Sequence, residues 1–215
     1  MTNAHYHDGD FTMLSSCGVE FRFIGMHPWN AEGVDVSMGL VRVREALSAE
    51  VAYGVGEIGL DRLKTRSVTA AQRILFEEQL EVAAELHRPV VLHGAKCWGD
   101  VVRTVRPYAG RIPSFLFHGF SRSGGLIPEI ASLNGFVSVG KAVLNDHAVN
   151  YRELVKSLPL DRLLVETDDA AGTVAERDAL LAQIFAKVAE LTSLTERQLD
   201  ENCARMLRSF HPLIG

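Results

Sequence analysis

Short apolar runs alternate with longer amphipathic segments along the chain. The runs are continuously apolar, as expected for strands that are buried on both faces of a parallel sheet. Residues 51–56, for example, contain β-branched and aromatic side chains and lead directly to Glu57. Eight such runs predict strands near residues 2–5, 11–15, 20–25, 51–57, 89–93, 114–118, 135–139 and 162–167.

Three of the intervening segments carry helix signals. Each opens with a threonine that has a glutamine or glutamate three residues later, which is the spacing of a capping box. These segments run from Thr69 to about His87, from Thr173 to about Thr192, and from Thr195 onward. In the first of them, apolar residues recur at helical spacing, so we expect one face to pack on the sheet.

Alternating strands and helices predict a parallel sheet, and eight strands predict a TIM-type (β/α) barrel. Such barrels typically need about 250 residues, and this chain has 215. The deficit lies near the N-terminus, because residues 8–23 leave no room for a helix between the first two strands. We therefore expect one domain, residues 1–215, that forms a shortened barrel with the first helix missing or reduced. A doubly wound open sheet is the alternative.

The charge balance argues against a broad basic surface as the source of affinity for a partner. The formal net charge is −5 at pH 7, whereas proteins that bind nucleic acid through charge alone are usually basic. A nucleic-acid substrate stays open, because bound divalent metal ions would add local positive charge.

Cysteine usage and the lack of an apolar run long enough to span a membrane predict a cytoplasmic protein. The cysteines, at positions 17, 97 and 203, are odd in number and form no CxxC motif, which favours reduced thiols. No apolar run approaches the length of a membrane span, and the N-terminus has no signal-peptide pattern. We expect neither a membrane association nor an obligate protein partner.

Candidate metal ligands follow the predicted strands. Glu57, His93, His118 and Asp168 each lie at the carboxyl end of an apolar run, where β/α barrels place their active sites. The separations of 36, 25 and 50 residues fit one, one and two βα units. Each residue also has an ordinary interpretation: a salt-bridged carboxylate for Glu57, a hydrogen-bonded core side chain for either histidine, and a helix N-cap for Asp168.

An H-x-H pair, His5 and His7, stands in the first predicted strand. Residues two apart on a strand point to the same face, so both imidazoles can reach one metal ion. The spacing alone is weak evidence, because such pairs also occur by chance. Together with the four later residues, however, they complete a mixed imidazole and carboxylate set that suits Zn, Mn, Fe or Mg.

The ordered motifs resemble those of the TatD-type metal-dependent deoxyribonucleases of the amidohydrolase-like barrels. The resemblance covers essentially the whole chain. It is carried by H-x-H at 5–7, G-M-H-P at 25–28, G-E-I-G-L-D at 56–61, the glutamines of the helix after Thr69, V-V-L-H-G at 90–94, F-H-G-F-S at 117–121, L-L-V-E-T-D at 163–168, and Asn202. The G-E-I-G-L-D and E-T-D segments, in register with the histidines, are specific in combination.

The resemblance implies a hydrolase with two divalent metal ions, which cleaves phosphodiester bonds with a metal-activated water. DNA or a small phosphodiester would be the substrate. The implied ligands are His5, His7 and Asp168 for the first ion, His93 and His118 for the second, and Glu57 as the bridge.

Further roles follow from the same resemblance. Glu57 and Asp168 would be the catalytic carboxylates, with Asp168 orienting the attacking water or taking its proton. Asp61 would not bind the metal itself but would orient Glu57 or a ligand histidine through a hydrogen bond. His27 and Lys96 are expected to contact substrate oxygens.

Three departures from the family pattern bear on the site: the first changes the surroundings of the first metal ion, and the other two bear on the substrate. Asn3 stands where the family usually has an aspartate, Ala95 where it often has an arginine, and residues 169–172 lack the usual proline-containing loop. Lys96 can replace the arginine as a cation, without its bidentate geometry. Two alternatives therefore stay open: a metal-dependent hydrolase of a small-molecule ester, amide or phosphate, and a catalytically inactive metal-binding relic.

Overall fold

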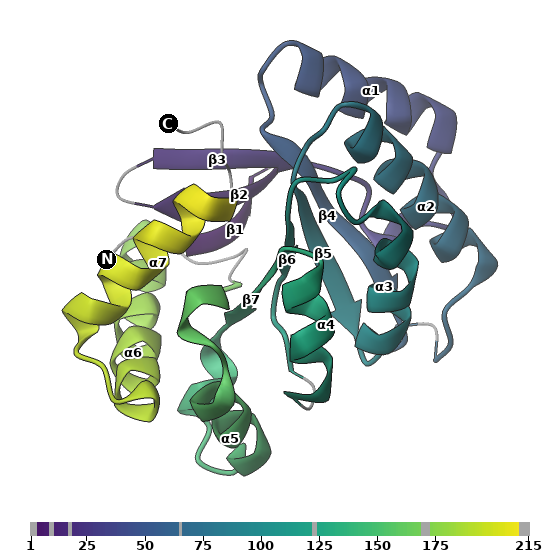
Figure 1. Cartoon of the computed structure of the whole chain (residues 1–215). Helices are drawn as coiled ribbons and strands as arrows, with labels where there is room; N and C mark the ends of the chain where they lie inside the picture. The colour runs from purple at the N-terminus through teal and green to yellow at the C-terminus, as the bar shows by residue number, and fades with distance from the viewer. Residues whose placement is uncertain are drawn as a thin grey trace.

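The computed structural model describes residues 4–8, 11–16, 19–64, 66–121, 124–168 and 173–210, and only the backbone of residues 4–8, 11, 13–16 and 19–20. The described strands form one eight-stranded sheet in which each strand pairs with the next along the chain (Figure 1). The strands are β1 (Ala4–Asp8), β2 (Phe11–Ser16), β3 (Val19–Ile24), β4 (Gly54–Asp61), β5 (Val90–Ala95), β6 (Phe115–Phe117), β7 (Gly135–Val139) and β8 (Leu163–Val165).

Strand directions divide the sheet into two parts. The expectation of a wholly parallel sheet is wrong for the first three strands. β1, β2 and β3 form an antiparallel meander, in which Asp8 pairs with Phe11 and Phe11 with Ile24, because the two-residue links between them can only reverse the chain. From β3 to β8 every pairing is parallel, which gives a six-stranded half-barrel. The sequential strand order excludes the doubly wound sheet, because that fold reverses its strand order. The predicted shortened barrel with no first helix is confirmed.

Among the described residues, five α-helices connect the parallel strands and two more follow β8. They are α1 (Val36–Ser48), α2 (Ala70–Glu85), α3 (Trp98–Val105), α4 (Ile127–Ser132), α5 (Val149–Ser157), α6 (Val174–Thr192) and α7 (Glu196–Phe210). The three predicted helices correspond to α2, α6 and α7. The α6 capping box is complete, because the Thr173 hydroxyl accepts from the Glu176 N–H and the Glu176 carboxylate accepts from the Thr173 N–H. In the described part of the chain, no helix is long and apolar enough to cross a membrane.

The fourth strand lies further along the chain than its apolar run suggested. The prediction placed it at residues 51–57, but β4 covers Gly54–Asp61 and all eight of its residues are buried. The strand continues because Gly59, Leu60 and Asp61 keep pairing with β5. Glu57 therefore lies inside the strand and not at its end.

Two glycines allow the close packing of β4, β5 and α3. A Cβ on Gly59, whose φ is +149°, would lie 2.1 Å from the carbonyl oxygen of His93. A Cβ on Gly94 would lie 2.3 Å from the Trp98 ring. Both distances are far below van der Waals contact, so these positions accept only glycine without local rearrangement.

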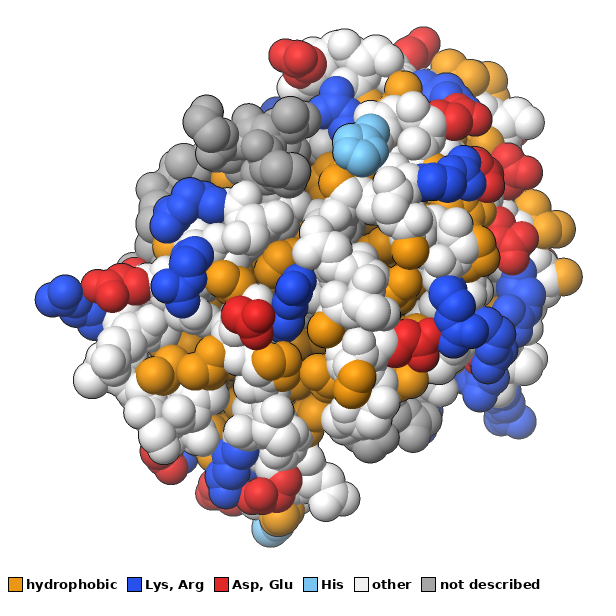
Figure 2. Space-filling view, viewed as in Figure 1, with side chains coloured by type: hydrophobic (Ala, Val, Ile, Leu, Met, Phe, Trp, Pro, Cys, Tyr) orange, Lys and Arg blue, Asp and Glu red, His pale blue; other side chains and the backbone are white. Residues whose placement is uncertain are grey.

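Charged side chains of both signs are interspersed over the face shown in Figure 2, with apolar side chains between them. The core is made mainly by the sheet and its covering helices, with Phe23, Phe76, Phe115, Phe117 and Phe185 among the largest fully buried side chains. This packing holds the strand ends at which the polar site is built.

Candidate active site

A pocket of about 380 Å³ lies at the carboxyl edge of the central strands. It is lined by His27, Trp29, Asn30, Glu57, His93, His118 and Asp168. Four of the six expected metal ligands thus reach one pocket from β4, β5, the end of β6 and the segment after β8.

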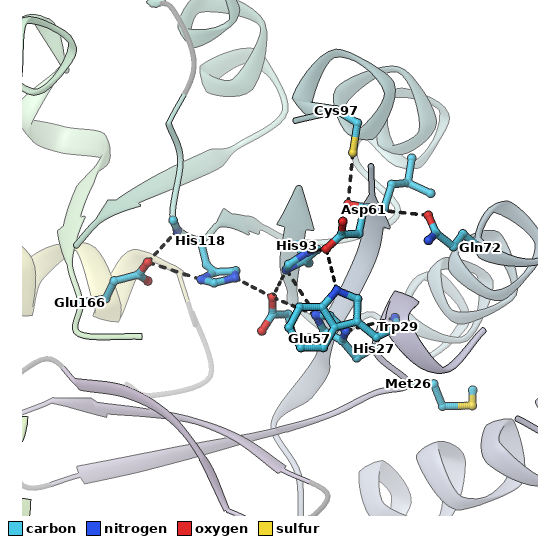
Figure 3. A network of polar contacts seen from close by, with 12 residues as sticks. Met26, His27, Trp29, Glu57, Asp61, Gln72, His93, Cys97, His118 and Glu166 are labelled. Atoms are coloured by element: carbon cyan, nitrogen blue, oxygen red, sulfur yellow. Dashed lines mark hydrogen bonds and ion pairs between the residues drawn. The ribbon is translucent and has the colours of Figure 1, made fainter. Parts of the chain in front are cut away.

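Glu57 is the centre of the group (Figure 3). Its Oε1 atom lies 2.6 Å from Nδ1 of His93, 2.5 Å from Nε2 of His118 and 3.8 Å from Nε2 of His27. The carboxylate reaches this position at an irregularity in the sheet. Val55 pairs with Val90 but Ile58 pairs with Leu92, so β4 has one residue more than β5. Such a bulge re-aims a side chain beside an active site.

Asp61 holds His93 from its other side. Nε2 of His93 lies 3.0 Å from Oδ2 of Asp61, and the same oxygen accepts a 2.6 Å hydrogen bond from Nε1 of Trp29. The backbone N–H groups of Leu63 and Lys64 donate to Oδ1 at 2.6 and 3.0 Å. Burial opposes ionisation of Asp61, but these hydrogen bonds outweigh it and hold the pKa of the carboxyl below its usual value.

His118 lies between two carboxylates. Nε2 faces Glu57, and Nδ1 lies 3.4 Å from Oε1 of Glu166. Glu166 is itself fixed by the Gly119 N–H at 2.6 Å and the Ser138 hydroxyl at 2.5 Å. Burial favours the neutral imidazole, yet the two glutamates outweigh it and raise the pKa of His118 well above its usual value.

His27 is carried by a short loop that α2 clamps. The Met26 N–H donates to Oε1 of Gln79 at 2.6 Å, and Nε2 of Gln79 donates to the Met26 carbonyl at 3.1 Å. Next along the chain, Nε2 of His27 lies 3.3 Å from Nδ1 of His93. A fully buried side chain on α2 therefore fixes the backbone from which His27 enters the cluster.

Trp29 forms an exposed wall of the pocket. Its side chain is 54% exposed, although its indole N–H is held by Asp61. Nζ of Lys64 lies 5.3 Å from the centre of the indole ring. An aromatic face with a cation over it, at the mouth of a polar pocket, is suited to a flat and anionic ligand.

The other expected site residues are placed as follows. Asp168 is exposed, has a φ of +50° and lines the pocket. The backbone of β1 pairs His5 with Leu14 and His7 with Thr12, but the side chains of both histidines, and the whole of Asn3, lie outside the described residues. Lys96 is exposed and lines a separate hollow beside α3.

Sequence reasoning did not assign a role to Glu166 or Trp29. Glu166 stands in the E-T-D segment, and its charge after an apolar strand was a usable signal, since a buried carboxylate requires partners. Trp29 directly follows the G-M-H-P segment. Its exposure, however, depends on the η1 turn (Pro28–Asn30) and could not be inferred from residue type.

The described donors fit a divalent metal ion. Single ligand atoms of His27, Glu57 and His93 all lie within 4.8 Å of one another. His93 and His118 each turn one ring nitrogen toward Glu57 and the other toward a further carboxylate. Metal-ligating histidines are commonly held in this way, because the outer carboxylate fixes the tautomer and leaves the inner nitrogen free to bind.

A β/α half-barrel with an imidazole and carboxylate centre at its strand ends has the architecture of a metal-dependent hydrolase, and comparison with known proteins gives that class, acting on ester bonds. The chain belongs to the TatD-related DNase family, whose sequence model, described as TatD related DNase, matches residues 12–211.

Two curated relatives illustrate the family. The chain is 28% identical over 207 residues to the uncharacterized metal-dependent hydrolase YabD of Bacillus subtilis, covering 91% of this chain and 80% of the relative. It is 31% identical over 194 residues to the 3'-5' ssDNA/RNA exonuclease TatD of Klebsiella pneumoniae, covering 83% and 73%.

Solved structures share the fold. The YJJV TatD homolog from Escherichia coli K12 superposes with a TM-score of 0.76 at 24% identity, over 89% of this chain and 76% of the other. A hydrolase TatD family protein from Entamoeba histolytica gives a TM-score of 0.72 at 15% identity, over 88% and 73%.

Proposed function

We propose that the chain is a nuclease that hydrolyses phosphodiester bonds of single-stranded DNA or RNA with two divalent metal ions. The observation that carries the proposal is the Glu57 carboxylate, which is 4% exposed and lies within 3.8 Å of three imidazoles. A buried cluster of this composition is costly unless a cation or protons compensate it. The name of the Klebsiella relative supports the choice of substrate.

The proposed ligands are His5, His7 and Asp168 for one ion, His93 and His118 for the other, and Glu57 between them. When bound, two such ions neutralise charge on a phosphodiester and activate a water molecule. Around them, Asp61 and Glu166 keep the inner nitrogens of His93 and His118 directed at Glu57.

Asp168 is the proposed proton acceptor. Its exposed carboxylate lines the pocket, so it can contact a water molecule that approaches from solvent. From there it orients the water toward phosphorus and takes the proton that the water loses on attack. His27, whose Nε2 lies 3.8 Å from the Glu57 carboxylate, donates a hydrogen bond to a phosphate oxygen.

Trp29 supports a nucleotide as the substrate. Its exposed ring offers a stacking surface to a base, and base–aromatic stacking contributes about 1–3 kcal/mol. The contact is sequence-tolerant because every base has a π-face. This arrangement suits an enzyme that cuts single strands without reading their sequence.

A substrate panel tests the proposal. Chelator-treated protein would be assayed with single-stranded DNA, RNA, duplex DNA and p-nitrophenyl esters, each with and without Mn²⁺, Mg²⁺ or Zn²⁺. We expect metal-dependent cleavage of the single strands and little activity on the duplex. Absence of cleavage of every nucleic acid under every metal condition would contradict the proposal.

Hydrolysis of a small ester is the second candidate function. The pocket volume of about 380 Å³ lies within the range that small-molecule sites occupy, about 300–1,000 Å³. The same panel separates the two candidates. Metal-dependent hydrolysis of carboxylic esters without cleavage of DNA or RNA would favour the small-ester function.

A further inference from the structure

A second hollow, of about 290 Å³, lies beside the candidate active site. Arg62, Lys96 and Arg103 line it together with Asp100 and the first residues of α3. This hollow is distinct from the pocket around Glu57, with which it shares none of its lining residues.

The hollow carries more positive charge than its carboxylate can neutralise. Oδ2 of Asp100 lies 2.5 Å from Arg62, and Oδ1 lies 2.9 Å from Arg103 and 3.9 Å from Arg73. Lys96 adds a further cation to the lining of the hollow, and it forms no ion pair with any other residue that the structure describes. One arginine would be enough to neutralise Asp100, so the surplus points to an anionic ligand.

Strand geometry puts this charge next to the site. Asp61 and Arg62 are consecutive: the Asp61 carboxylate contacts His93, while the Arg62 guanidinium contacts Asp100 on the other side. Lys96 follows the end of β5, three residues after His93. Because β4 and β5 are parallel and paired up to Asp61 and Ala95, both cations leave the sheet at the edge where the pocket opens.

The arginines are held but accessible. The side chains of Arg62 and Arg73 are each 44% exposed, and that of Arg103 is 68% exposed. The Asp100 side chain is only 10% exposed, so it acts as an anchor beneath them. Guanidinium groups fixed in this way lose little entropy on binding and match the geometry of phosphate oxygens.

We propose that the hollow lined by Arg62, Lys96 and Arg103 binds backbone phosphates of nucleotides adjacent to the one being cut. The inference rests on the proposed nuclease function and extends it, because it assigns a second contact site to a polynucleotide. In a chain with a net charge of −5, such a local surplus is what draws a strand to this edge.

The test compares binding of a long substrate, which can reach the hollow, with hydrolysis of a small substrate, which cannot. Arg103→Gln and the double variant Arg62→Gln/Arg103→Gln would be compared with wild type for binding of a fluorescent single-stranded dT oligonucleotide in EDTA, measured by anisotropy. Hydrolysis of bis(p-nitrophenyl) phosphate with Mn²⁺ gives the second readout. Arg197→Gln is the matched control, because this arginine pairs with Glu201 on α7.

We expect the double variant to bind the oligonucleotide on the order of tenfold more weakly, because it loses two charged hydrogen-bond donors and water replaces part of the lost contacts. The salt dependence should fall by about one unit of slope per arginine that contacts a phosphate. Hydrolysis of the small diester should be unchanged. Arg103→Lys, which keeps the charge, should retain most of the affinity.

Unchanged oligonucleotide affinity and salt slope in the double variant, with an unaltered melting temperature, would overturn this assignment. An equal loss in Arg197→Gln would also overturn it, because the effect would then be one of overall charge. Failure of the proposed nuclease function would give another result, which can be told apart from these two: the wild type would hydrolyse neither the diester nor the oligonucleotide.

Discussion

At the scale of single residues, two buried glutamines on α2 hold the backbone of the site. Gln72 accepts a 3.1 Å hydrogen bond from the Asp61 N–H, and Gln79 pairs with both backbone groups of Met26. Polar side chains so deep in a protein are retained only when their hydrogen bonds are made. Here they tie the loop of His27 and the end of β4 to the same helix.

Replacing Gln79 with leucine should destabilise the protein by about 1–3 kcal/mol, because the Met26 N–H would lose its partner. Urea unfolding of chelator-treated protein measures the change. Gln183→Leu, at an exposed position of α6, is the control and should change stability by about 0.5 kcal/mol or less. Equal effects of the two substitutions would show that the clamp on Met26 has no energetic role.

Trp29 is expected to serve the substrate through its ring. Trp29→Ala should raise KM for a single-stranded oligonucleotide on the order of tenfold, from the loss of about 1–3 kcal/mol of stacking. Trp29→Phe loses the hydrogen bond to Asp61 but keeps an aromatic ring. Because the ring still stacks on a base, the KM of this variant should stay closer to that of the wild type. Steady-state kinetics with both variants decides the matter, and a KM for Trp29→Ala equal to that of wild type would refute the stacking role.

Cys97 should be unreactive in the folded protein. Its thiol is 4% exposed and donates to the Leu60 carbonyl at 3.1 Å, and burial raises its pKa to about 11. The thiolate is the reactive form, so alkylation should be very slow at pH 8 and should accelerate as the pH rises toward that pKa. Peptide mass spectrometry after iodoacetamide treatment measures the labelling, and rapid labelling of native Cys97 at pH 8 would contradict the burial.

The residue scale also shows what sequence reasoning can find. Glu57, His93, His118 and Asp168 were selected by their position after apolar runs, and the structure brings all four to one pocket. The partner of His118 was not found, because contact between Glu166 and His118 depends on the packing of β8 near β6, across β7. Sequence spacing does not encode that distance.

At the scale of elements, the apolar runs predicted all eight strands, but the parallel direction expected for all of them is wrong for the first three. β2 runs antiparallel to both of its neighbours. The pattern of apolar residues is the same whether a strand runs parallel or antiparallel, so it does not indicate the direction. The bulge that turns Glu57 into the pocket was also hidden, since register is a property of the paired strands. Three helices were predicted individually, because only those carried clear capping signals.

Gly59 and Gly99 make a matched pair for testing the close approach of β4 to β5. Gly59→Ala should destabilise the protein by about 2–3 kcal/mol, because its Cβ would collide with a backbone carbonyl that cannot move away cheaply. Gly99 lies in α3 with no atom within 4 Å of an added Cβ, so Gly99→Ala should stabilise by about 0.5–1 kcal/mol. Thermal unfolding gives both values, and a neutral Gly59→Ala would contradict the packing described for this strand pair.

At the scale of the whole molecule, chain length predicted the form of the barrel. A chain of 215 residues is short for eight βα units. Only two residues separate β1 from β2, and two separate β2 from β3, which leaves no room for a helix in either link. Net charge was less informative. The chain is acidic overall, yet cations gather in the hollow beside α3. The end of β4 is followed by Arg62, the end of β5 is followed by Lys96, and α3 itself carries Arg103.

The central claim is that Glu57 organises a metal centre, and calorimetric titration of chelator-treated protein with Mn²⁺ tests it most directly. The wild type is predicted to bind about two ions per chain. Glu57→Gln, with the same folded spectrum, is predicted to bind them at least about 100-fold more weakly, because it loses the charge on which three imidazoles converge. Equal affinity and stoichiometry in the two proteins, or no binding by the wild type, would contradict the account.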